Sequence, residues 1–396
     1  AILKRETKGG KASQSLRCPV HCPNPHSCMK LNHLFLTTAI CLFSLCCTTS
    51  KTNSKESDSL PATALKPYGR FVMNLQQNLE MVSSAMHFGF SFEGKQCQIR
   101  ATIPNGDGHN YLQYELDGVY QKRIKIAGHS AKPIVITAPT GGKHTVWVYK
   151  ATEAHTGPIV IQKITGNQLK PLQKITAPLI EFIGNSITCG AAADPSEVPC
   201  GSGQYHDQHN AYMAYGPRVA RALGTDFVLS SVSGIGVYRN WNSNGPTMPD
   251  VYERPDFQVN NSQRWNFNTF LPQIVSIALG TNDFSEGDGK RERLPFDSAS
   301  YVNTYLKFIK VVKSKYPKAQ VALLSSPMLN GKNRSTLQNC LAAVKAGADA
   351  ANPSDKPVAL YFFRSMRARG CSGHPSVEDH AMLAQELVPF FSKLLH

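Results

Sequence analysis

The sequence predicts an α/β protein with two structural parts, an N-terminal β-sandwich and a C-terminal parallel sheet with helices on both faces. Three observations support this prediction. The chain has 396 residues, a length that suits two domains. Short strand-like runs with turn dipeptides between them fill residues 68–172, and helical segments alternate with buried strands from residue 177 onward. We expect a leader over residues 1–65, the sandwich over 66–172 and the α/β domain over 173–396.

The leader has the build of a secretory signal. Met29 and Lys30 precede the apolar stretch Leu34–Cys47, which is too short to span a bilayer as a helix. The pair Cys46-Cys47 indicates a bacterial lipoprotein signal with a lipid anchor; the residue before Cys46 is not small, so ordinary cleavage is the alternative. Residues 51–65 are rich in Ser, Thr and Lys and are typical of a tether. We therefore expect an exported bacterial protein that is secreted, periplasmic or held at the outer membrane.

Charge and cysteine are concentrated in this leader. The chain carries a formal net charge of +15, which first suggests a nucleic acid or an acidic membrane surface as partner. Eight basic and three acidic residues, together with six of the eleven cysteines, lie within residues 1–65. No run of five basic residues marks a nucleic-acid stripe. Since export also disfavours such a role, we expect no nucleic-acid partner.

The N-terminal domain is predicted from runs that alternate apolar and polar residues. They are separated by turn dipeptides such as Asn105-Gly106, Asp117-Gly118 and Gly141-Gly142, a spacing typical of a β-sandwich. The expected strands include Gln96–Thr102, Leu112–Leu116, Ile134–Thr137 and Thr145–Lys150. No catalytic constellation occurs in this part of the sequence. We expect an accessory or packing domain, with carbohydrate binding as the alternative.

The C-terminal domain is predicted from a change of period after residue 177. Apolar runs of strand length alternate with segments of helical period, which favours a parallel sheet covered on both faces. The expected strands are Leu179–Ile183, Phe227–Ser231, Ile274–Leu279, Ala319–Ser325 and Val358–Phe362, and the expected helices are Asn210–Leu223, Ser298–Tyr316, Ser335–Ala350 and Ser376–Leu395. In such sheets the functional site lies beyond the carboxyl ends of the strands.

Three of these strand ends and the start of the last helix carry residues that could take part in catalysis. Ser186 follows the first strand, where a strand-to-helix turn can expose a hydroxyl. Gly234 follows the second strand and lets a backbone N–H approach a ligand, and Asn282 follows the third with an amide that can donate to an oxyanion. His374 precedes the last helix and could serve as a general base.

Each of these residues also has a purely structural interpretation. Ser186 can be a helix cap, Gly234 part of a tight turn, and Asn282 a turn and cap residue. A single histidine is more often a surface or structural residue, and His380, inside the last helix, is the better candidate for that role. The order of the four residues and their placement at successive strand ends favour a site.

These four residues resemble the four blocks of the SGNH (GDSL-type) hydrolases, which bear Ser, Gly, Asn and His in that order. The resemblance implies that Ser186 is the nucleophile and His374 the general base and acid. It also implies an oxyanion hole formed by the backbone N–H groups of Ser186 and Gly234 and the side chain of Asn282, with Gly236 as a weaker alternative to Gly234. The expected course is attack on an acetyl carbonyl, an acetyl-enzyme and its hydrolysis by water.

Within that superfamily the chain is most similar to carbohydrate esterase family 2. The similarity lies in the stretches Phe182–Gly190, Ser233–Trp241 and Ala278–Ser285 and in the β-sandwich before them, so it spans roughly residues 68–396. It implies a jelly-roll-like sandwich followed by a flavodoxin-like three-layer α/β/α hydrolase domain. The implied activity is removal of O-acetyl groups from plant polysaccharide, acetylated xylan first of all, by a serine carboxylic-ester hydrolase that needs no cofactor.

Two positions depart from the superfamily's pattern. The residue before the nucleophile is Asn185 instead of Asp, for which we expect a structural adjustment and no loss of activity. The superfamily's D-x-x-H motif would place an acid at position 371, which is Cys371 here. Because some members of the esterase family work as a Ser–His dyad with a backbone carbonyl orienting the imidazole, we predict a dyad. The carboxylates that could still complete a triad are Asp207, Glu378 and Asp379.

The residues that would contact the substrate are less well marked. Tyr238, Trp241 and Trp265 lie near the second and third blocks and could stack on a sugar ring, with core or rim packing as the alternative. Cys189 and Cys200 flank the loop after the nucleophile and could form a disulfide in an exported protein, or remain two buried thiols. No metal-ligand spacing occurs near the blocks, so we expect no metal, which disfavours a zinc-dependent deacetylase.

Taken together, these features predict an exported, monomeric carbohydrate O-acetyl esterase that acts on acetylated polysaccharide or oligosaccharide. One alternative is a lipase or thioesterase of the same superfamily, which the dependence of activity on acyl-chain length would reveal. The other alternative is a non-catalytic carbohydrate-binding surface lipoprotein. The intact Ser, Gly, Asn and His argue against it.

Overall fold

The computed structural model describes residues 58–128, 132–173 and 177–396. The expected signal segment and the candidate lipidation site at Cys46-Cys47 lie outside the described residues. Residues 58–65, expected in the tether, instead form strand β1 (Asp58–Pro61) and a 3-10 turn, because Leu60 and Leu65 are buried in the core of the N-terminal domain. In the described part of the chain, no helix is both long and apolar enough to cross a bilayer.

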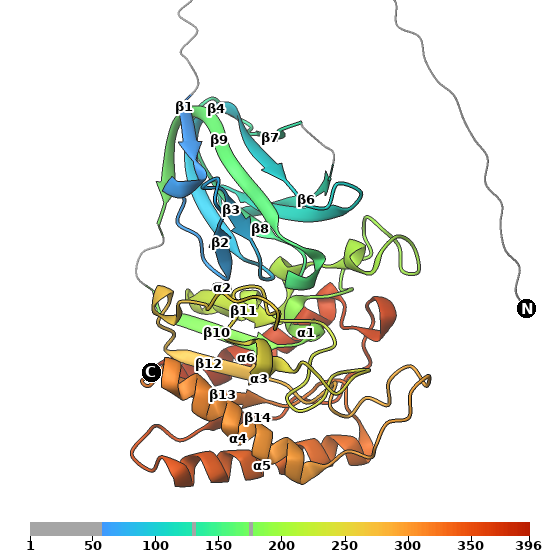
Figure 1. The fold of residues 1–396 in the computed structure, drawn as a ribbon. Helices are drawn as coiled ribbons and strands as arrows, with labels where there is room; N and C mark the ends of the chain where they lie inside the picture. Colours follow the sequence, from blue (N-terminus) through green and yellow to red (C-terminus); the bar gives the residue numbers. More distant parts are fainter. Residues whose placement is uncertain (1–57, 129–131, 174–176) are drawn as a thin grey trace, which may run out of the picture. The chain divides into compact units, whose positions relative to one another are not determined.

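The N-terminal domain is an antiparallel sheet of nine strands (Figure 1). Besides β1 these are β2 (Phe71–Met73), β3 (Leu79–Met81), β4 (His87–Thr102), β5 (His109–Leu116), β6 (Val119–Ala127), β7 (Ile134–Thr137), β8 (Lys143–Lys150) and β9 (Ile159–Leu172). Their order is β2-β3-β9-β4-β8-β5-β6, with β1 beside β9 and β7 beside β4. Phe88, Phe90 and Phe92, at alternate positions of β4, are fully buried, as expected for a strand face that lines a core. The expected strand runs are confirmed, and the jelly-roll-like sandwich stays a prediction.

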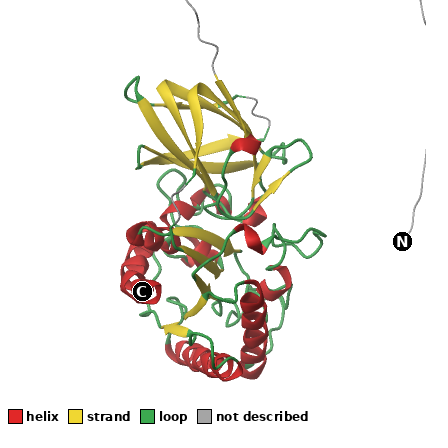
Figure 2. Cartoon of the chain, turned by 90° about the vertical axis from the view of Figure 1, so that its left-hand side faces the viewer, coloured by secondary structure: helices red, strands yellow, loops and turns green. Residues whose placement is uncertain are grey.

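The C-terminal domain is a parallel sheet of five strands between two layers of helices (Figure 2). Its strands, β10 (Leu179–Gly184), β11 (Asp226–Ser231), β12 (Ile274–Ala278), β13 (Gln320–Leu324) and β14 (Ala359–Tyr361), lie in the order β11-β10-β12-β13-β14. Helices α2 (Tyr215–Leu223) and α6 (Val377–Leu395) pack on one face, and α4 (Ser298–Lys315) and α5 (Gly331–Ala351) pack on the other. This arrangement confirms the predicted α/β domain.

The expected helix Asn210–Leu223 is interrupted in the structure. The Asn210 side chain accepts a hydrogen bond from the Met213 N–H and caps a 3-10 turn. Ala214 is then extended, with φ −63° and ψ 158°, so α2 begins only at Tyr215. The segment before α2 is therefore a short 3-10 turn followed by one extended residue.

The register of the sheet places three strand ends side by side. Gly184, the last residue of β10, pairs with Ser231 of β11 and with Ala278 of β12. Because the three strands are parallel, the chain leaves all of them at the same edge of the sheet. The loops that follow these strands therefore converge, and they are the loops that carry the first three blocks.

Candidate active site

The first block is a tight turn from β10 into the short helix α1 (Ser186–Cys189). Asn185 caps this helix, since its Oδ1 accepts a hydrogen bond from the Ile187 N–H at 3.1 Å. A Cβ on Gly184 would lie 2.0 Å from the Thr188 hydroxyl, so the turn requires glycine at that position. Asn185 thus provides the capping oxygen that an aspartate would provide, and the turn keeps its geometry.

The second block is a loop fixed on both sides of Gly234. Gly234 has φ +75°, and its carbonyl accepts a hydrogen bond from the Trp241 N–H at 2.7 Å. The N–H of Ser233 is bound by a carboxylate, Glu153 Oε2, at 2.6 Å. The N–H of Gly236, by contrast, donates to the Asn240 side chain. Gly236 therefore has no free donor, and the geometry favours Gly234 as the oxyanion-hole residue.

The third block binds the second one through two side chains. Asn282 Nδ2 donates to the Ile235 carbonyl at 2.7 Å, which leaves its second N–H for a ligand. The Asp283 carboxylate is fully buried and accepts the backbone N–H groups of the turn at Val237, Tyr238 and Arg239. Burial raises the pKa of Asp283 to about 6, although these hydrogen bonds favour its charged form. Blocks two and three therefore form one rigid unit.

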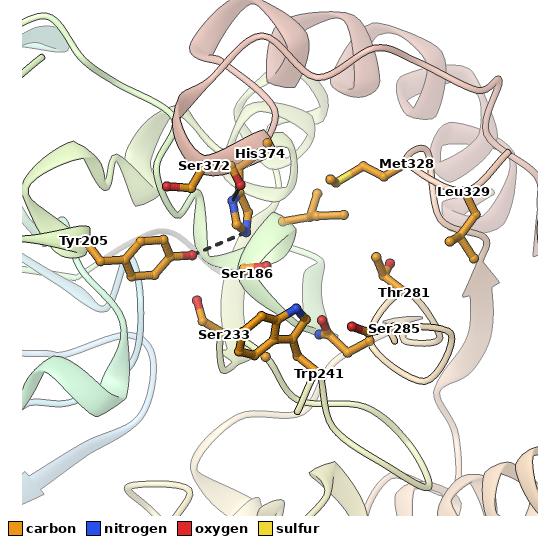
Figure 3. A pocket seen from close by; sticks show the side chains of 14 residues that line it. Ser186, Tyr205, Ser233, Trp241, Thr281, Ser285, Met328, Leu329, Ser372 and His374 are labelled. Carbon is orange, nitrogen blue, oxygen red and sulfur yellow. Dashed lines mark hydrogen bonds between the residues drawn. The ribbon is translucent and has the colours of Figure 1, made fainter. Parts of the chain in front are cut away.

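The histidine of the fourth block is oriented by a backbone carbonyl. His374 Nδ1 lies 3.1 Å from the Ser372 carbonyl oxygen, and Nε2 lies 3.3 Å from the Tyr205 hydroxyl (Figure 3). Because a carbonyl can only accept, the neutral imidazole carries its proton on Nδ1 and has a free electron pair on Nε2. Burial lowers the pKa of His374, so the basic form persists at mildly acidic pH.

In this structure Nε2 bonds the Tyr205 hydroxyl, and no hydrogen bond to Ser186 is formed. Catalytic hydrogen bonds are often long or absent without substrate and form in the reacting complex. Ser186 lines the same pocket as His374 and Tyr205, as Figure 3 shows. The three side chains therefore share one polar centre.

The three candidate triad acids have partners other than His374 among the described residues. Asp379 is fully buried, pairs with Arg369 and caps α6 at Ser376. Glu378 accepts a hydrogen bond from the Ser376 hydroxyl at 2.7 Å. Asp207 is paired with His109. The geometry therefore supports the dyad.

The expected pairing of Cys189 with Cys200 is wrong, and so is the alternative of two free thiols. Cys200 forms a disulfide with Cys371, across a sequence separation of 171 residues. Cys189 is a buried free thiol whose Sγ lies 3.2 Å from the Ser231 hydroxyl, because α1 directs it toward the sheet. The disulfide occupies the position of the missing triad acid and joins the loop after the nucleophile to the loop of His374.

A pocket of about 730 Å³ unites the four predicted residues (Figure 3). Ser186, Gly234, Asn282 and His374 all line it, together with Tyr205, Ser233, Trp241, Thr281, Ser285, Met328 and Leu329. Trp241 is 48% exposed and lies at the pocket's surface, as expected for a residue that stacks on a sugar. His380 is fully buried away from the pocket against Tyr215, which confirms its structural role.

Two of the three expected substrate-contacting aromatics do not line this pocket. Tyr238 packs against Phe296, and its hydroxyl accepts a hydrogen bond from the Asp297 N–H. Trp265 packs edge-on against Phe71 of β2 and lies beside the buried Arg70 guanidinium. Their packing agrees with the alternative of core or rim packing, because proximity in sequence to a block does not place a ring in the cavity.

Sequence reasoning missed Tyr205, Met328 and Leu329. Tyr205 lies in a 3-10 turn (Tyr205–Gln208) within the long loop after the nucleophile, which carries no periodic signal. Met328 and Leu329 follow β13, the strand after the third block. The general rule that sites lie at carboxyl strand ends could have identified those two residues, but no local feature identified Tyr205.

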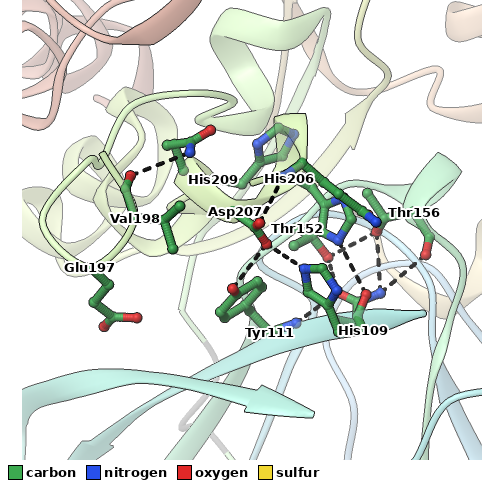
Figure 4. A network of polar contacts seen from close by, with 12 residues as sticks. His109, Tyr111, Thr152, Thr156, Glu197, Val198, His206, Asp207 and His209 are labelled. Atoms are coloured by element: carbon green, nitrogen blue, oxygen red, sulfur yellow. Dashed lines mark hydrogen bonds and ion pairs between the residues drawn. The ribbon is translucent and has the colours of Figure 1, made fainter. Parts of the chain in front are cut away.

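One further group of residues has metal-binding side chains. The ligand atoms of His109, His206 and Asp207 lie within 4.8 Å of one another (Figure 4). Asp207 already accepts hydrogen bonds from His109, from the Tyr111 hydroxyl and from the Gln204 N–H, while His206 Nε2 lies 3.1 Å from the His109 carbonyl. Since these groups are bound to one another, they link β5 to the loop that carries Tyr205.

Two family models and several known proteins match this chain. Residues 68–174 match the family model described as Carbohydrate esterase 2 N-terminal, and residues 182–378 match the GDSL-like Lipase/Acylhydrolase family. A Cellvibrio japonicus protein described as acetylxylan esterase / glucomannan deacetylase is 30% identical over 309 residues, covering 77% of this chain and 82% of that protein. A second protein of that organism and description is 25% identical over 304 residues, covering 75% and 80%.

Solved structures show the same similarity. A family two carbohydrate esterase from Clostridium thermocellum, in complex with cellohexaose, superimposes with a TM-score of 0.72 and 25% identity, over 84% of this chain and 99% of that one. A family two carbohydrate esterase from Cellvibrio japonicus has a TM-score of 0.74 at 23% identity, over 85% and 98%, and so shares the fold.

Proposed function

Because this chain belongs to carbohydrate esterase family 2 and is a carboxylic-ester hydrolase, we propose that it removes O-acetyl groups from plant polysaccharide. Its main substrate in this proposal is acetylated xylan. The convergence of Ser186, Gly234, Asn282 and His374 in one pocket is the observation that carries this proposal.

The proposed reaction begins with attack of Ser186 Oγ on the acetyl carbonyl carbon. His374 Nε2 accepts the serine proton, while the Ser372 carbonyl holds Nδ1 and stabilises the imidazolium. The N–H groups of Ser186 and Gly234 and the Asn282 amide stabilise the oxyanion. His374 then donates its proton to the departing sugar oxygen, which leaves an acetyl-enzyme on Ser186. Water hydrolyses this ester by the reverse sequence of proton transfers.

The substrate preference is proposed from the pocket and the relatives. Trp241, largely exposed at the pocket, provides a flat surface for a sugar ring. The relatives are described as acetylxylan esterase / glucomannan deacetylase, and one solved relative holds cellohexaose. Ile187, Met328 and Leu329 make part of the pocket apolar, which suits an acyl group and would also suit the longer chains of a lipase or thioesterase.

We also propose that the enzyme is exported and acts as a monomer. The apolar stretch Leu34–Cys47 supports a signal sequence, with Cys46-Cys47 as candidate site of a lipid anchor. The Cys200–Cys371 disulfide supports an oxidising compartment.

The test is acetate release from acetylated xylan, acetylated glucomannan and simple sugar acetates, together with a series of model esters of increasing chain length. We expect the highest kcat/KM on acetylated oligosaccharide, activity that falls beyond acetyl, and no release by Ser186→Ala. Activity that rises with chain length would favour the lipase or thioesterase, and binding without turnover would favour the non-catalytic lipoprotein.

A further inference from the structure

Glu153 of the N-terminal domain contacts the loops that form the hydrolase site. It lies between β8 and a 3-10 turn (Ala154–Thr156), and its side chain is 5% exposed. Its carboxylate contacts three elements that line the active-site pocket: the Ser233–Gly234 loop, helix α1 through Cys189, and the Tyr205 loop through His209. A buried carboxylate at such a junction costs free energy to desolvate, so its contacts require an explanation.

The first contact fixes the oxyanion loop. Glu153 Oε2 accepts the Ser233 N–H at 2.6 Å, one residue before Gly234. On the other side, the Gly234 carbonyl accepts the Trp241 N–H at 2.7 Å. With both flanking groups bound, the Gly234 peptide unit has a fixed orientation, and its N–H can be pre-aligned for an oxyanion.

The second contact, between Glu153 and His209, connects the carboxylate indirectly to His374. The Ala192 N–H donates to His209 Nδ1 at 3.3 Å, so His209 carries its proton on Nε2 and donates to Glu153 Oε1 at 3.4 Å. The Tyr205 ring meets the His209 ring edge-on at 4.7 Å between centroids, and the Tyr205 hydroxyl bonds His374 Nε2. The carboxylate is thus connected to the catalytic imidazole through two packed side chains.

Glu153 holds a negative charge in this position. Burial alone would raise the pKa of Glu153, but the hydrogen bonds from His209 and Ser233 outweigh it and bring the pKa to about 2. The other ionisable groups that face it are the Cys189 thiol, Tyr205, and the Lys150 ammonium, which donates to the Glu153 carbonyl. At His374 burial opposes the imidazolium most strongly, while the Ser372 carbonyl and the charge of Glu153 favour it.

We propose that Glu153 is a positioning residue of the esterase, which orients the Ser233–Gly234 oxyanion loop and provides the buried negative charge that a triad carboxylate provides elsewhere. This inference rests on the proposed function. It also gives the N-terminal domain a role in the reaction, since that domain contributes the charge.

The test compares three variants in the full chain. In Glu153→Gln one carboxylate oxygen becomes an NH2 group, which meets either the Ser233 or the His209 N–H, so one of these donors loses its acceptor. We expect kcat to fall about tenfold or more, a fraction of the effect of a lost oxyanion donor, with KM within about twofold. In the plot of kcat/KM against pH, the acid limb should shift to lower pH, because the Glu153 charge that favours the His374 imidazolium is gone.

Two further variants separate the effect of the Glu153 charge from the effects of its contact geometry and of protein stability. Glu153→Asp keeps the charge but shortens the reach, so its acid limb should stay near that of the wild type while kcat falls. Glu115→Gln is the matched control: Glu115 is a buried glutamate of the same domain that binds the Tyr149 and Tyr212 hydroxyls. It should lose thermal stability without a change in kcat or in the acid limb.

An NMR titration of the His374 ring measures the same effect without substrate. The pKa of His374 should be lower in Glu153→Gln than in the wild type and in Glu115→Gln. An unchanged His374 titration, or a wild-type kcat in Glu153→Gln, would overturn the inference. A wild type that releases no acetate would instead refute the proposed function, and the titration would still decide the role of Glu153.

Discussion

The disulfide between Cys200 and Cys371 links the loop of Tyr205 to the loop of His374, and its removal should destabilise the protein. The bond closes a loop of 171 residues. Loop-closure entropy for that length corresponds to about 5 kcal/mol at 25 °C, the upper end of what disulfides contribute. Backbone hydrogen bonds from Cys371 to Ala192 and from Gly370 to His374 hold the same region, so the fold should survive the loss.

The assay is chemical unfolding of the wild type and of the Cys200→Ser/Cys371→Ser double variant, each with and without reductant. We expect a loss of about 2–5 kcal/mol in the double variant and in the reduced wild type. Reductant should have no effect on the double variant, which is the internal control. Equal free energies of unfolding for the oxidised wild type and the double variant would refute the reasoning, because the bond would then constrain nothing in the unfolded chain.

Three further predictions concern the site. Burial lowers the pKa of His374 below its usual 6.5, so the decline of kcat/KM at acidic pH should be centred below 6.5; a decline centred at or above 6.5 would contradict the neutral-base assignment. Asn282→Ala should lower kcat by about 10²–10³ with little change in KM, and a loss under about tenfold would remove Asn282 from the oxyanion hole. Trp241→Ala should raise KM for acetylated oligosaccharide up to about tenfold, since an aromatic contact contributes ~0.5–1.5 kcal/mol; Trp265→Ala, the matched control, should lower stability and leave KM unchanged.

The parallel sheet and four site residues could be predicted because their signals are local. Each strand of the C-terminal domain is a short apolar run, and Ser186, Gly234 and Asn282 directly follow such runs. Once the strands are parallel, the topology itself brings these residues to one edge. His374 could be identified as the general base because it matches the fourth block of the superfamily and directly precedes the last helix.

The remaining features depend on contacts between distant segments, for which one sequence carries no signal. The partner of Cys200 lies 171 residues away, and the pairing of cysteines cannot be deduced from their spacing. Glu153 and Tyr205 lie in irregular segments whose position is set by the packing of the two domains. Trp265 lies near a block in the sequence, but its contacts with Arg70 and Phe71 hold its ring outside the pocket.

The most direct test of the dyad is the kcat/KM for acetate release by Ser186→Ala and His374→Ala beside Asp207→Asn, Glu378→Gln and Asp379→Asn. A Ser–His dyad oriented by the Ser372 carbonyl predicts losses of about 10⁴-fold or more in the first two variants. Each of the three amide variants should keep most of the wild-type activity. A loss of about 10⁴-fold in any one of them would identify a triad acid and contradict the dyad.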